Sequence, residues 1–501
     1  MIGLAATRNQ ILIRNSVSFN ILKRHKKKSR EPKVTNSQRA LEYFDIAYAP
    51  VYGTRWPSIR LALLSKPKYM AVLNNFASYD ETIERFQNLG AWDIREKYSA
   101  IRERMRQRRE QSQATSEDRD EDTDETSVRS NSVRPSLVEL DDDELAARAR
   151  LEPEGRYPEE YRLRAAAQNV DATGLEVDLA SRVIAPSETG GSSLMMDYVP
   201  ATRLKGLENW MEEADVFPDA SQGDQDIGVT VVKQEEPIDL PKMLKIFAFE
   251  KGNISDFPQP RFDPQLRVLD HYAMDGASLL PVLALDVKPG DRVLDMCAAP
   301  GGKSLLVLQT LMPGLLVSND VSEGRVKRIR SILKQFVPKG MSTIENLTVV
   351  TQNDGCRLGE AEEYDKILVD VPCLTDRHSL MDDDNSLFKT SRTKERLKLP
   401  ELQSQLLVSA LQALRPGGTV VYSTCTLSPL QNDGVVHLAL SRIWQETTIE
   451  CSVVDMSQAV RPLSFLYRFG GNLGLRYGQL ILPSLLSNFG PMYCAKIKRI
   501  R

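Results

Sequence analysis

The chain has 501 residues, six cysteines and a formal net charge of −3. Its length exceeds the size at which one hydrophobic core usually stops growing, so we expect a large domain with accessory segments. No apolar run reaches the roughly 20 residues of a transmembrane helix, and the cysteines lack the close pairs of zinc sites and the density of disulfide scaffolds. We therefore expect no membrane span and reduced thiols. The small net charge does not exclude a nucleic-acid partner, because it averages segments of opposite sign, among them the basic end Lys496–Arg501.

The first segment, residues 1–33, contains many lysines and arginines, scattered apolar residues and no acidic residue before Glu31. This composition is typical of a mitochondrial transit peptide, so we expect the protein in the mitochondrial matrix. A basic tail that contacts RNA or directs nuclear import is the alternative.

The next segment, residues 36–105, carries apolar side chains at helical spacing, which predicts an N-terminal helical module. The residues that carry this pattern are Leu41, Phe44, Tyr48, Ile59, Leu61, Leu63, Leu64, Met70, Val72 and Leu73. The module is either an RNA-facing arm or a structural cap on the main domain.

Residues 106–243 form a segment rich in acid, Ser and Pro, as in Ser116–Glu125. Such a segment buries too little apolar area to offset its ordering entropy, so we predict a mostly disordered linker.

From residue 244 to 501, short apolar, β-branched runs alternate with helical stretches. The predicted strands are 292–296, 315–319, 347–351, 366–371 and 419–423, and the predicted helices are 303–311, 323–336, 399–414 and 430–443. This alternation predicts an α/β, Rossmann-like fold with a parallel sheet. Its ligand crevice lies at the carboxyl ends of the strands, where the strand order reverses. Later runs at 452–455, 479–482 and 493–497 predict antiparallel edge strands.

The first predicted strand runs into a glycine turn, Ala298–Ser304, and then into a helix whose backbone N–H groups suit an anion or a carboxylate. A phosphate-binding P-loop is disfavoured, because Cys297 stands where that motif needs Gly, and no G-x-G-x-x-G fingerprint is present. Asp320 after the second strand suits ribose hydroxyls, and Asp354–Gly355 after the third suits an adenine edge. The ordered set favours S-adenosylmethionine, although each acid alone is equally well a helix cap.

Two cysteines follow later strands, Cys373 in Asp370–Cys373 and Cys425 in Ser423–Thr426. Carbon 5 of cytosine is a weak nucleophile toward a sulfonium methyl group, but thiolate addition at carbon 6 places electron density on carbon 5. N3 must then accept a proton or a strong hydrogen bond, and Asp370 can serve it if burial raises the pKa of its carboxyl group. The sequence therefore predicts an enzyme that methylates a carbon of a nucleic-acid base.

The strings Asp295–Lys303, Asp370–Cys373 and Ser423–Thr426 resemble the motifs of the Sun-domain (NSUN) RNA cytosine-5 methyltransferases. The resemblance implies that Cys425 attacks the base and that Cys373 assists release of the covalent adduct. This is the reverse of DNA cytosine methyltransferases, whose nucleophile lies in a Pro-Cys motif. The resemblance also implies S-adenosylmethionine as cofactor, with contacts from Gly301, Gly302, Lys303, Asp320, Arg325, Asp354, Gly355 and Asp370.

Three further strings resemble the mitochondrial branch that modifies small-subunit ribosomal RNA: Trp56–Arg60, Leu374–Leu380 in place of the usual Ser-Gly-rich turn, and Asn488–Tyr493. The likeness covers about residues 40–104 and 244–501. It implies a helical-repeat partner of the mitochondrial termination-factor type and support of mitoribosome assembly. The acidic insertion departs from the pattern, and Leu430–Asp433 replaces the usual Glu-Asn-Glu, which puts partner and RNA contacts in doubt rather than the chemistry.

Several alternatives stay open at this level. Arg377 and His378 either orient the target base or a phosphate, or cap a loop. The basic residues of the predicted helix 323–336 either hold RNA phosphates or form a solvated face. The substrate is alternatively a transfer RNA, and the protein is alternatively a non-catalytic ribosome-assembly or RNA-binding factor. We expect the remaining cysteines to act as small apolar side chains; these are Cys297, Cys356, Cys451 and Cys494.

Overall fold

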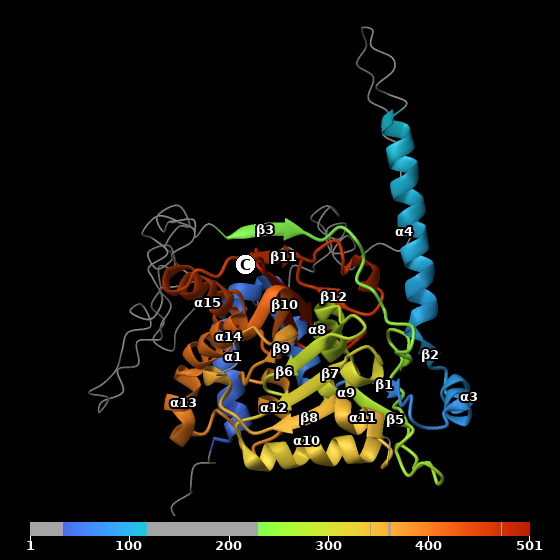
Figure 1. The fold of residues 1–501 in the computed structure, drawn as a ribbon. Helices are drawn as coiled ribbons and strands as arrows, with labels where there is room; N and C mark the ends of the chain where they lie inside the picture. The colour runs from blue at the N-terminus through green and yellow to red at the C-terminus, as the bar shows by residue number, and fades with distance from the viewer. Residues whose placement is uncertain (1–33, 118–228, 341, 359–361, 472) are drawn as a thin grey trace, which may run out of the picture.

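The computed structural model describes residues 34–117, 229–340, 342–358, 362–471 and 473–501. They form a large mixed sheet with helices on both faces and a small antiparallel sheet beside it (Figure 1). The predicted transit peptide, residues 1–33, and most of the predicted acidic linker lie outside the described residues. Within the described part of the chain, no helix combines the length and apolar character needed to cross a membrane.

Five parallel strands form the centre of the large sheet, in the order β8-β7-β6-β9-β10. Their bounds are β6 (Arg292–Asp295), β7 (Leu315–Asn319), β8 (Thr348–Thr351), β9 (Tyr364–Asp370) and β10 (Leu414–Thr424). The chain builds outward from β6 to β8 and then returns to place β9 on the other side of β6. The order therefore reverses between β6 and β9, which confirms the predicted α/β fold and puts its crevice at that point.

The C-terminal edge of this sheet is antiparallel, as predicted. Strand β14 (Met492–Arg499) pairs with β10 on one side, and with β13 (Gly478–Leu482) and β11 (Cys451–Asp455) on the other. Strand β12 (Arg468–Phe469) pairs antiparallel with β13, and β3 (Thr230–Lys233) pairs parallel with β11. Strand β3 and the buried residues Ile238 and Leu240 fall inside the predicted linker 106–243, so the C-terminal end of that segment belongs to the fold.

The central strands carry apolar residues on both faces because both faces are covered. In β10, Val420 and Tyr422 join one core cluster, and Val421 joins the other. The helices that cover or flank the sheet are α8 (Leu279–Leu285), α9 (Gly302–Gln309), α10 (Glu323–Phe336), α11 (Ser342–Leu347), α12 (Asp376–Met381), α13 (Thr393–Leu397), α14 (Leu399–Ala413) and α15 (Asp433–Glu446). The four predicted helices are present as α9, α10, α14 and α15, and α10 has the predicted bounds.

The N-terminal module is mixed rather than helical throughout. It contains α1 (Asn36–Tyr52), α2 (Trp56–Leu64), α3 (Asp80–Asn88) and α4 (Ile94–Glu117), but also β1 (Tyr69–Leu73) and β2 (Trp92–Asp93). The helical assignment of Met70, Val72 and Leu73 was wrong, because a short apolar run does not separate a helix from a buried strand. Strand β1 lies between β4 (Ile246–Ala248) and β5 (His271–Asp275), so this module shares a sheet with the main domain.

Helix α1 packs its aromatic face against the main domain. Phe44, Tyr48 and Tyr52 recur at every fourth residue and are buried, with the rings of Phe44 and Tyr48 stacked 5.1 Å apart. Phe44 also meets Phe388 edge to face at 5.3 Å. Burial of an aromatic side chain of this kind stabilises a fold by roughly 2 kcal/mol. Of the two interpretations left open for the module, the contacts of α1 favour the structural cap.

Candidate active site

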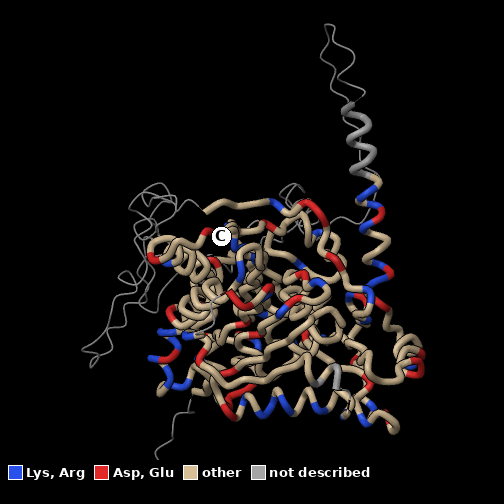
Figure 2. Tube along the Cα trace, viewed as in Figure 1, with Lys and Arg blue, Asp and Glu red and all other residues tan. Residues whose placement is uncertain are grey.

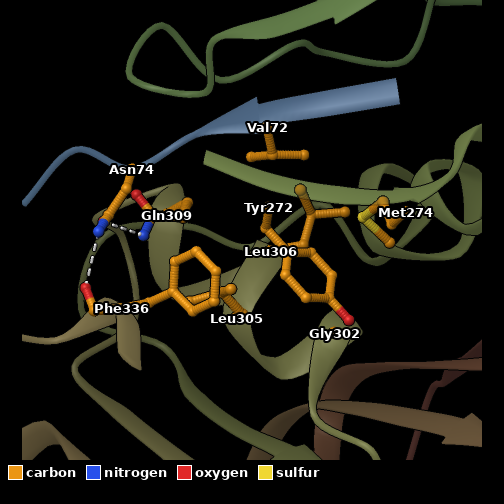
Figure 3. Close-up of a pocket in the computed structure, with 9 residues that line it drawn as sticks. All are labelled: Val72, Asn74, Tyr272, Met274, Gly302, Leu305, Leu306, Gln309 and Phe336. Atoms are coloured by element: carbon orange, nitrogen blue, oxygen red, sulfur yellow. Dashed lines mark hydrogen bonds between the residues drawn. The ribbon is translucent and has the colours of Figure 1, made fainter. Parts of the chain in front are cut away.

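The glycine turn connects β6 to α9 at the carboxyl end of the sheet. Gly301 has φ 115°, a conformation that side chains rarely adopt, and a Cβ atom on Gly302 would lie 2.9 Å from the hydroxyl of Tyr272. Both positions therefore require glycine, and the first N–H groups of α9 open toward the crevice. Figure 3 shows the other side of this turn, where Tyr272, Leu305 and Phe336 pack in an apolar seam between β1, β5 and α9. That seam packs α9 against β1 and β5.

Asp295 at the end of β6 is buried, and the Ser304 hydroxyl donates to its Oδ2 at 2.6 Å. Burial, together with the negative charge of nearby Asp370, raises the pKa of the Asp295 carboxyl to about 7. Its Oδ1 is buried without a hydrogen-bond partner among the described residues. A buried, unpartnered acceptor is costly, so this oxygen fits a site completed by a polar ligand.

The predicted cofactor residues of the next two strands lie along the same edge of the sheet. Asp320, which follows β7, is 3% exposed and pairs with Arg325, whose Nε lies 2.9 Å from Asp320 Oδ2. Arg325 also donates to the carbonyl of Ala299 at 3.1 Å, which ties the second strand end to the glycine turn. Asp354 follows β8, and a Cβ atom on Gly355 would lie 2.9 Å from a methyl carbon of Leu406, so the chain packs closely here. Asp320 is placed to suit the ribose of S-adenosylmethionine and Asp354 its adenine, while Asp295 lies at the strand end beside the glycine turn, which suits the amino-acid part.

Asp370, at the end of β9, has two partners in the site. Lys303 Nζ donates to its Oδ2 at 2.7 Å, and the Ser423 hydroxyl donates to its Oδ1 at 2.8 Å. The side chain of Asp370 is 28% exposed and that of Lys303 is 14% exposed. We expected a carboxyl group in a desolvated pocket. The structure places an ammonium group against it, because Lys303 in the first turn of α9 faces the neighbouring strand β9.

The two cysteines, 52 positions apart in the chain, lie side by side. Cys373 Sγ and Cys425 Sγ are 3.3 Å apart, and the backbone N–H of Cys425 donates to Cys373 Sγ at 3.4 Å. Cys373 is 3% exposed. Parallel neighbours β9 and β10 end in register, with Ser423 opposite Asp370, which brings the two motifs together. The predicted catalytic residues Cys425, Cys373 and Asp370 therefore form one cluster.

Three neighbouring features shift the pKa of the Cys425 thiol in this arrangement. Its hydrogen bond with Cys373 and its burial raise its pKa well above the ordinary thiol value, while the positive charge of Lys303 lowers it. Lys303 is thus the cation that favours a thiolate at Cys425. A thiol pair beside an Asp–Lys pair, at the crevice of an α/β sheet, is suited to nucleophilic addition followed by proton transfer.

Comparison with known proteins identifies the family. A model described as 16S rRNA methyltransferase RsmB/F matches residues 282–466. The 5-cytosine rRNA methyltransferase NSUN4 of Xenopus tropicalis is 36% identical and aligns over 99% of this chain and 100% of its own length. The chain belongs to the Sun-domain RNA cytosine-5 methyltransferases. It is therefore an enzyme that uses S-adenosylmethionine to methylate carbon 5 of cytosine in RNA.

Two further relatives are similar over about half of the chain. The mitochondrial tRNA (cytosine(34)-C(5))-methyltransferase of Danio rerio is 43% identical over 46% of this chain and 61% of its own length. The solved structure of NSun6 from Pyrococcus horikoshii with the S-adenosylmethionine analogue SFG is 25% identical, with a TM-score of 0.37, over 46% of this chain and 54% of that chain.

Arg377 and His378 of this Sun-domain enzyme have different environments. The Arg377 guanidinium donates to the carbonyls of Gly490, Ala62 and Ser65 and to the side chain of Asn488, so it joins segments rather than facing the cysteines. His378 is exposed on α12. Of the two interpretations left open, the contacts of Arg377 favour the structural one.

The remaining cysteines show no special environment. Cys494 lies fully buried in β14, and burial raises its pKa to about 12. Burial likewise raises the pKa of Cys356 and that of Cys451, each to about 11. Cys297 is half-buried in the glycine turn, and burial raises its pKa as well. Such thiols are poor nucleophiles at neutral pH.

The basic helix α10 presents its lysines and arginines at the surface, along one edge of the molecule (Figure 2). Lys327 pairs with Glu323 at 2.7 Å, and Arg325 pairs with Asp320. Arg328, Arg330 and Lys334 are exposed on the same helix. The helix therefore carries a net positive surface next to the predicted cofactor residues, and this surface is compatible with RNA phosphates or with a solvated face.

Sequence reasoning assigned no role at the site to Asp376 or Tyr48, which touch the loop that carries Cys425. Asp376 lies three positions after Cys373 and contacts Thr426, and Tyr48 of α1 contacts both. The signal for Asp376 was its place in the string that replaces a Ser-Gly turn. Nothing in the sequence indicated that Tyr48, 378 positions before Thr426, would reach this loop.

Proposed function

We propose that Cys425 is the nucleophile of this methyltransferase and that it forms a covalent bond to carbon 6 of the target cytosine. The target base is first unstacked from the RNA and taken into the crevice. The Cys425 thiolate then adds to carbon 6, and electron density moves to carbon 5 and N3. S-adenosylmethionine supplies the electrophilic methyl group that carbon 5 receives. The closeness of Cys425, Cys373, Asp370 and Lys303 is the observation that carries this proposal.

The Asp370–Lys303 pair serves the charge that develops on the base. Lys303 Nζ donates to Asp370 Oδ2 at 2.7 Å, so the proton that N3 takes up comes from the Lys303 ammonium group through the Asp370 carboxylate and returns by the same path when the C6–S bond breaks. Lys303 also places a positive charge near Cys425, which favours the attacking thiolate. After methyl transfer, the carbon-5 proton must leave before the C6–S bond breaks. Cys373, 3.3 Å from Cys425, is the group we assign to that release.

The cofactor site comprises residues from the ends of four neighbouring strands. The glycine turn with Gly301, Gly302 and Lys303 faces the amino-acid tail of S-adenosylmethionine. Asp320 accepts hydrogen bonds from the ribose hydroxyls, and Arg325 orients Asp320. The remaining members of the site are Asp354 and Gly355 beside the adenine and Asp370 near the methyl group.

We assign small-subunit ribosomal RNA of the mitochondrion as the substrate. Support comes from the Xenopus tropicalis relative, which aligns over its whole length and is named an rRNA methyltransferase. The acid-free residues 1–30 support a mitochondrial matrix location, and a role in mitoribosome assembly with a helical-repeat partner of the termination-factor type is part of the proposal. Transfer RNA is the second candidate, because the Danio rerio relative that matches about half of the chain is named a mitochondrial tRNA enzyme.

Two variants test the chemistry. Cys425→Ala is expected to lose methyl transfer, whereas Cys373→Ala is expected to accumulate an RNA–protein adduct through Cys425 that survives denaturing electrophoresis. Methyl transfer by Cys425→Ala at the wild-type rate would overturn the assignment of the nucleophile. Absence of an adduct with Cys373→Ala, substrate RNA and cofactor would overturn the assigned role of Cys373.

Bisulfite sequencing of organellar RNA after loss of the protein tests the substrate. We expect an unmethylated cytosine in the small-subunit rRNA and unchanged transfer RNAs. Loss of a tRNA methylation beside intact rRNA would select the second candidate. Rescue by Cys425→Ala that restored both methylation and growth would overturn the catalytic claim for Cys425 and favour a non-catalytic assembly factor.

A further inference from the structure

The loop that carries Cys425 is held by groups on both sides of that residue. Before it, the Thr424 hydroxyl donates to Asn432 Oδ1 at 2.6 Å. After it, the Thr426 hydroxyl donates to Asp376 Oδ1 at 2.7 Å, and the Leu427 N–H donates to Asp376 Oδ2 at 2.8 Å. Asp376 therefore holds two successive residues directly after the nucleophile.

Helix α1 contributes two further contacts to the same loop. The Tyr48 hydroxyl lies 3.1 Å from Thr426 Oγ1 and 3.3 Å from Asp376 Oδ1. The Tyr52 hydroxyl donates to the carbonyl of Leu427 at 2.6 Å. Both tyrosines are buried, at 1% and 4% exposure. The N-terminal helix thus reaches the backbone and side chains next to Cys425.

An ordinary helix-capping role does not account for Asp376. It is the first residue of α12, where an acidic residue commonly stabilises the helix N-terminus. Its two carboxyl oxygens, however, accept hydrogen bonds from Thr426 and Leu427 on a different loop. The side chain is fully buried, and burial raises its pKa to about 7. Burying a carboxyl group is unfavourable unless its partners are fixed, so the site depends on this exact set of contacts.

We propose that Asp376 and Tyr48 are positioning residues for the Cys425 nucleophile, so that the N-terminal helix α1 forms part of the catalytic centre. This inference rests on the proposed role of Cys425. Asp376 lies three residues after Cys373 in the chain and binds the residues that follow Cys425, so it links the two cysteine loops. Loss of this link lets the loops separate, and displacement of a reacting group by about 1 Å costs up to about 100-fold in rate.

Single-turnover methyl transfer with radiolabelled S-adenosylmethionine and substrate RNA tests the proposal. We expect the rate constant to fall by about 10-fold or more in Asp376→Asn and by at least about 3-fold in Tyr48→Phe. The dissociation constants for S-adenosylmethionine and for RNA should stay within about twofold of wild type, because neither residue contacts the cofactor site. An equal loss of cofactor or RNA affinity in these variants would overturn the positioning role.

Tyr98→Phe is the matched control. Tyr98 lies on α4, and its buried hydroxyl donates to the carbonyl of Ile238 rather than to the Cys425 loop, so this variant also removes one buried tyrosine hydroxyl. We expect it to retain the wild-type rate. Equal slowing by Tyr98→Phe and Tyr48→Phe would show general loosening of the fold and overturn the proposal.

Thr426 supplies a second, independent readout that remains if Asp376→Asn does not fold. Thr426→Val is close in shape and lacks the hydroxyl, whereas Thr426→Ser keeps it. We expect the single-turnover rate constant of Thr426→Ser to be at least about fivefold higher than that of Thr426→Val. Equal rate constants in the two variants would overturn the role of the Asp376 contact. Methyl transfer by Cys425→Ala would refute the proposed function itself. Inactive Cys425→Ala beside wild-type rates in Asp376→Asn and Tyr48→Phe would refute only the positioning role.

Discussion

Replacement of Arg377 by methionine tests whether this side chain stabilises the fold or binds RNA. Its guanidinium donates to the carbonyls of Gly490, Ala62 and Ser65 at 2.9, 3.0 and 3.0 Å and to Asn488 Oδ1 at 2.9 Å. Ala62 lies in the last turn of α2 and Ser65 is its C-cap, whereas Gly490 and Asn488 precede β14. One side chain therefore joins the N-terminal module to the C-terminal edge of the sheet.

The magnitude follows from the acceptors that lose their donor. Methionine has a similar length but donates no hydrogen bond, and each buried acceptor left unpaired costs about 1 kcal/mol or more. The carbonyl of Ala62 still accepts from the Ser65 N–H, and that of Ser65 from the side-chain amide of Asn488. Two of the four acceptors are therefore left unpaired, which gives an expected loss of about 2–3 kcal/mol. Arg377→Lys keeps the charge, but one ammonium group cannot donate to all the acceptors that the planar guanidinium group reaches. We therefore expect an intermediate loss of about 1–2 kcal/mol in the free energy of unfolding.

Urea unfolding followed by circular dichroism measures this loss, and RNA binding by the folded variant supplies the second readout. We expect a lower unfolding midpoint for Arg377→Met and an RNA dissociation constant within about twofold of wild type. Wild-type stability combined with a tenfold weaker, less salt-dependent RNA affinity would refute the reasoning, because that pattern belongs to a phosphate contact.

Three further results are expected. Because its hydrogen bond with Cys373 and its burial raise the pKa of Cys425, the single-turnover rate should rise about tenfold per pH unit between about pH 6 and 8; a flat profile would contradict a thiol that ionises in the rate-limiting step. Gly478→Ala should destabilise the protein by about 1–3 kcal/mol in thermal or urea unfolding, because the new Cβ would lie 2.3 Å from the Tyr493 ring, and an unchanged midpoint would show that the ring moves freely. The pKa of Asp295 is raised to about 7, so between about pH 4 and 7 the folded state binds more protons than the unfolded state, and the free energy of unfolding falls as pH rises. Asp295→Asn should reduce that fall by up to about 1.4 kcal/mol per pH unit. An identical pH dependence of the unfolding free energy in both proteins would exclude Asp295 as its source.

The parallel sheet and the cysteine cluster were predictable because their signals are local. Each central strand is a short β-branched run followed by a motif, and the carboxyl ends of parallel strands meet at one edge of the sheet. Asp370 and Ser423 therefore had to lie close together once β9 and β10 were neighbours, as their paired register shows. Cys373 and Cys425 follow these strand ends and meet for the same reason.

The contacts of the N-terminal module were not predictable, because they depend on pairing between distant segments. Strand β1 pairs with β5, about 200 residues later, and a run of four buried residues from Met70 to Leu73 has no periodicity that separates strand from helix. The cationic partner of Asp370 was equally hidden. Lys303 was assigned to the cofactor, and only the packing of α9 against the sheet shows that its ammonium group reaches Asp370.

The contact between Tyr52 and Leu427 also bears on biosynthesis. These residues are 375 positions apart, so at ordinary translation rates of about 5–20 residues per second the aromatic face of α1 waits roughly 20–75 s for its partners to be made. During that interval the nascent chain exposes an aggregation-prone apolar surface formed by Phe44, Tyr48 and Tyr52. Newly made protein should therefore depend on chaperones until the last third of the chain has emerged, and premature termination before that point should leave a product that proteases remove.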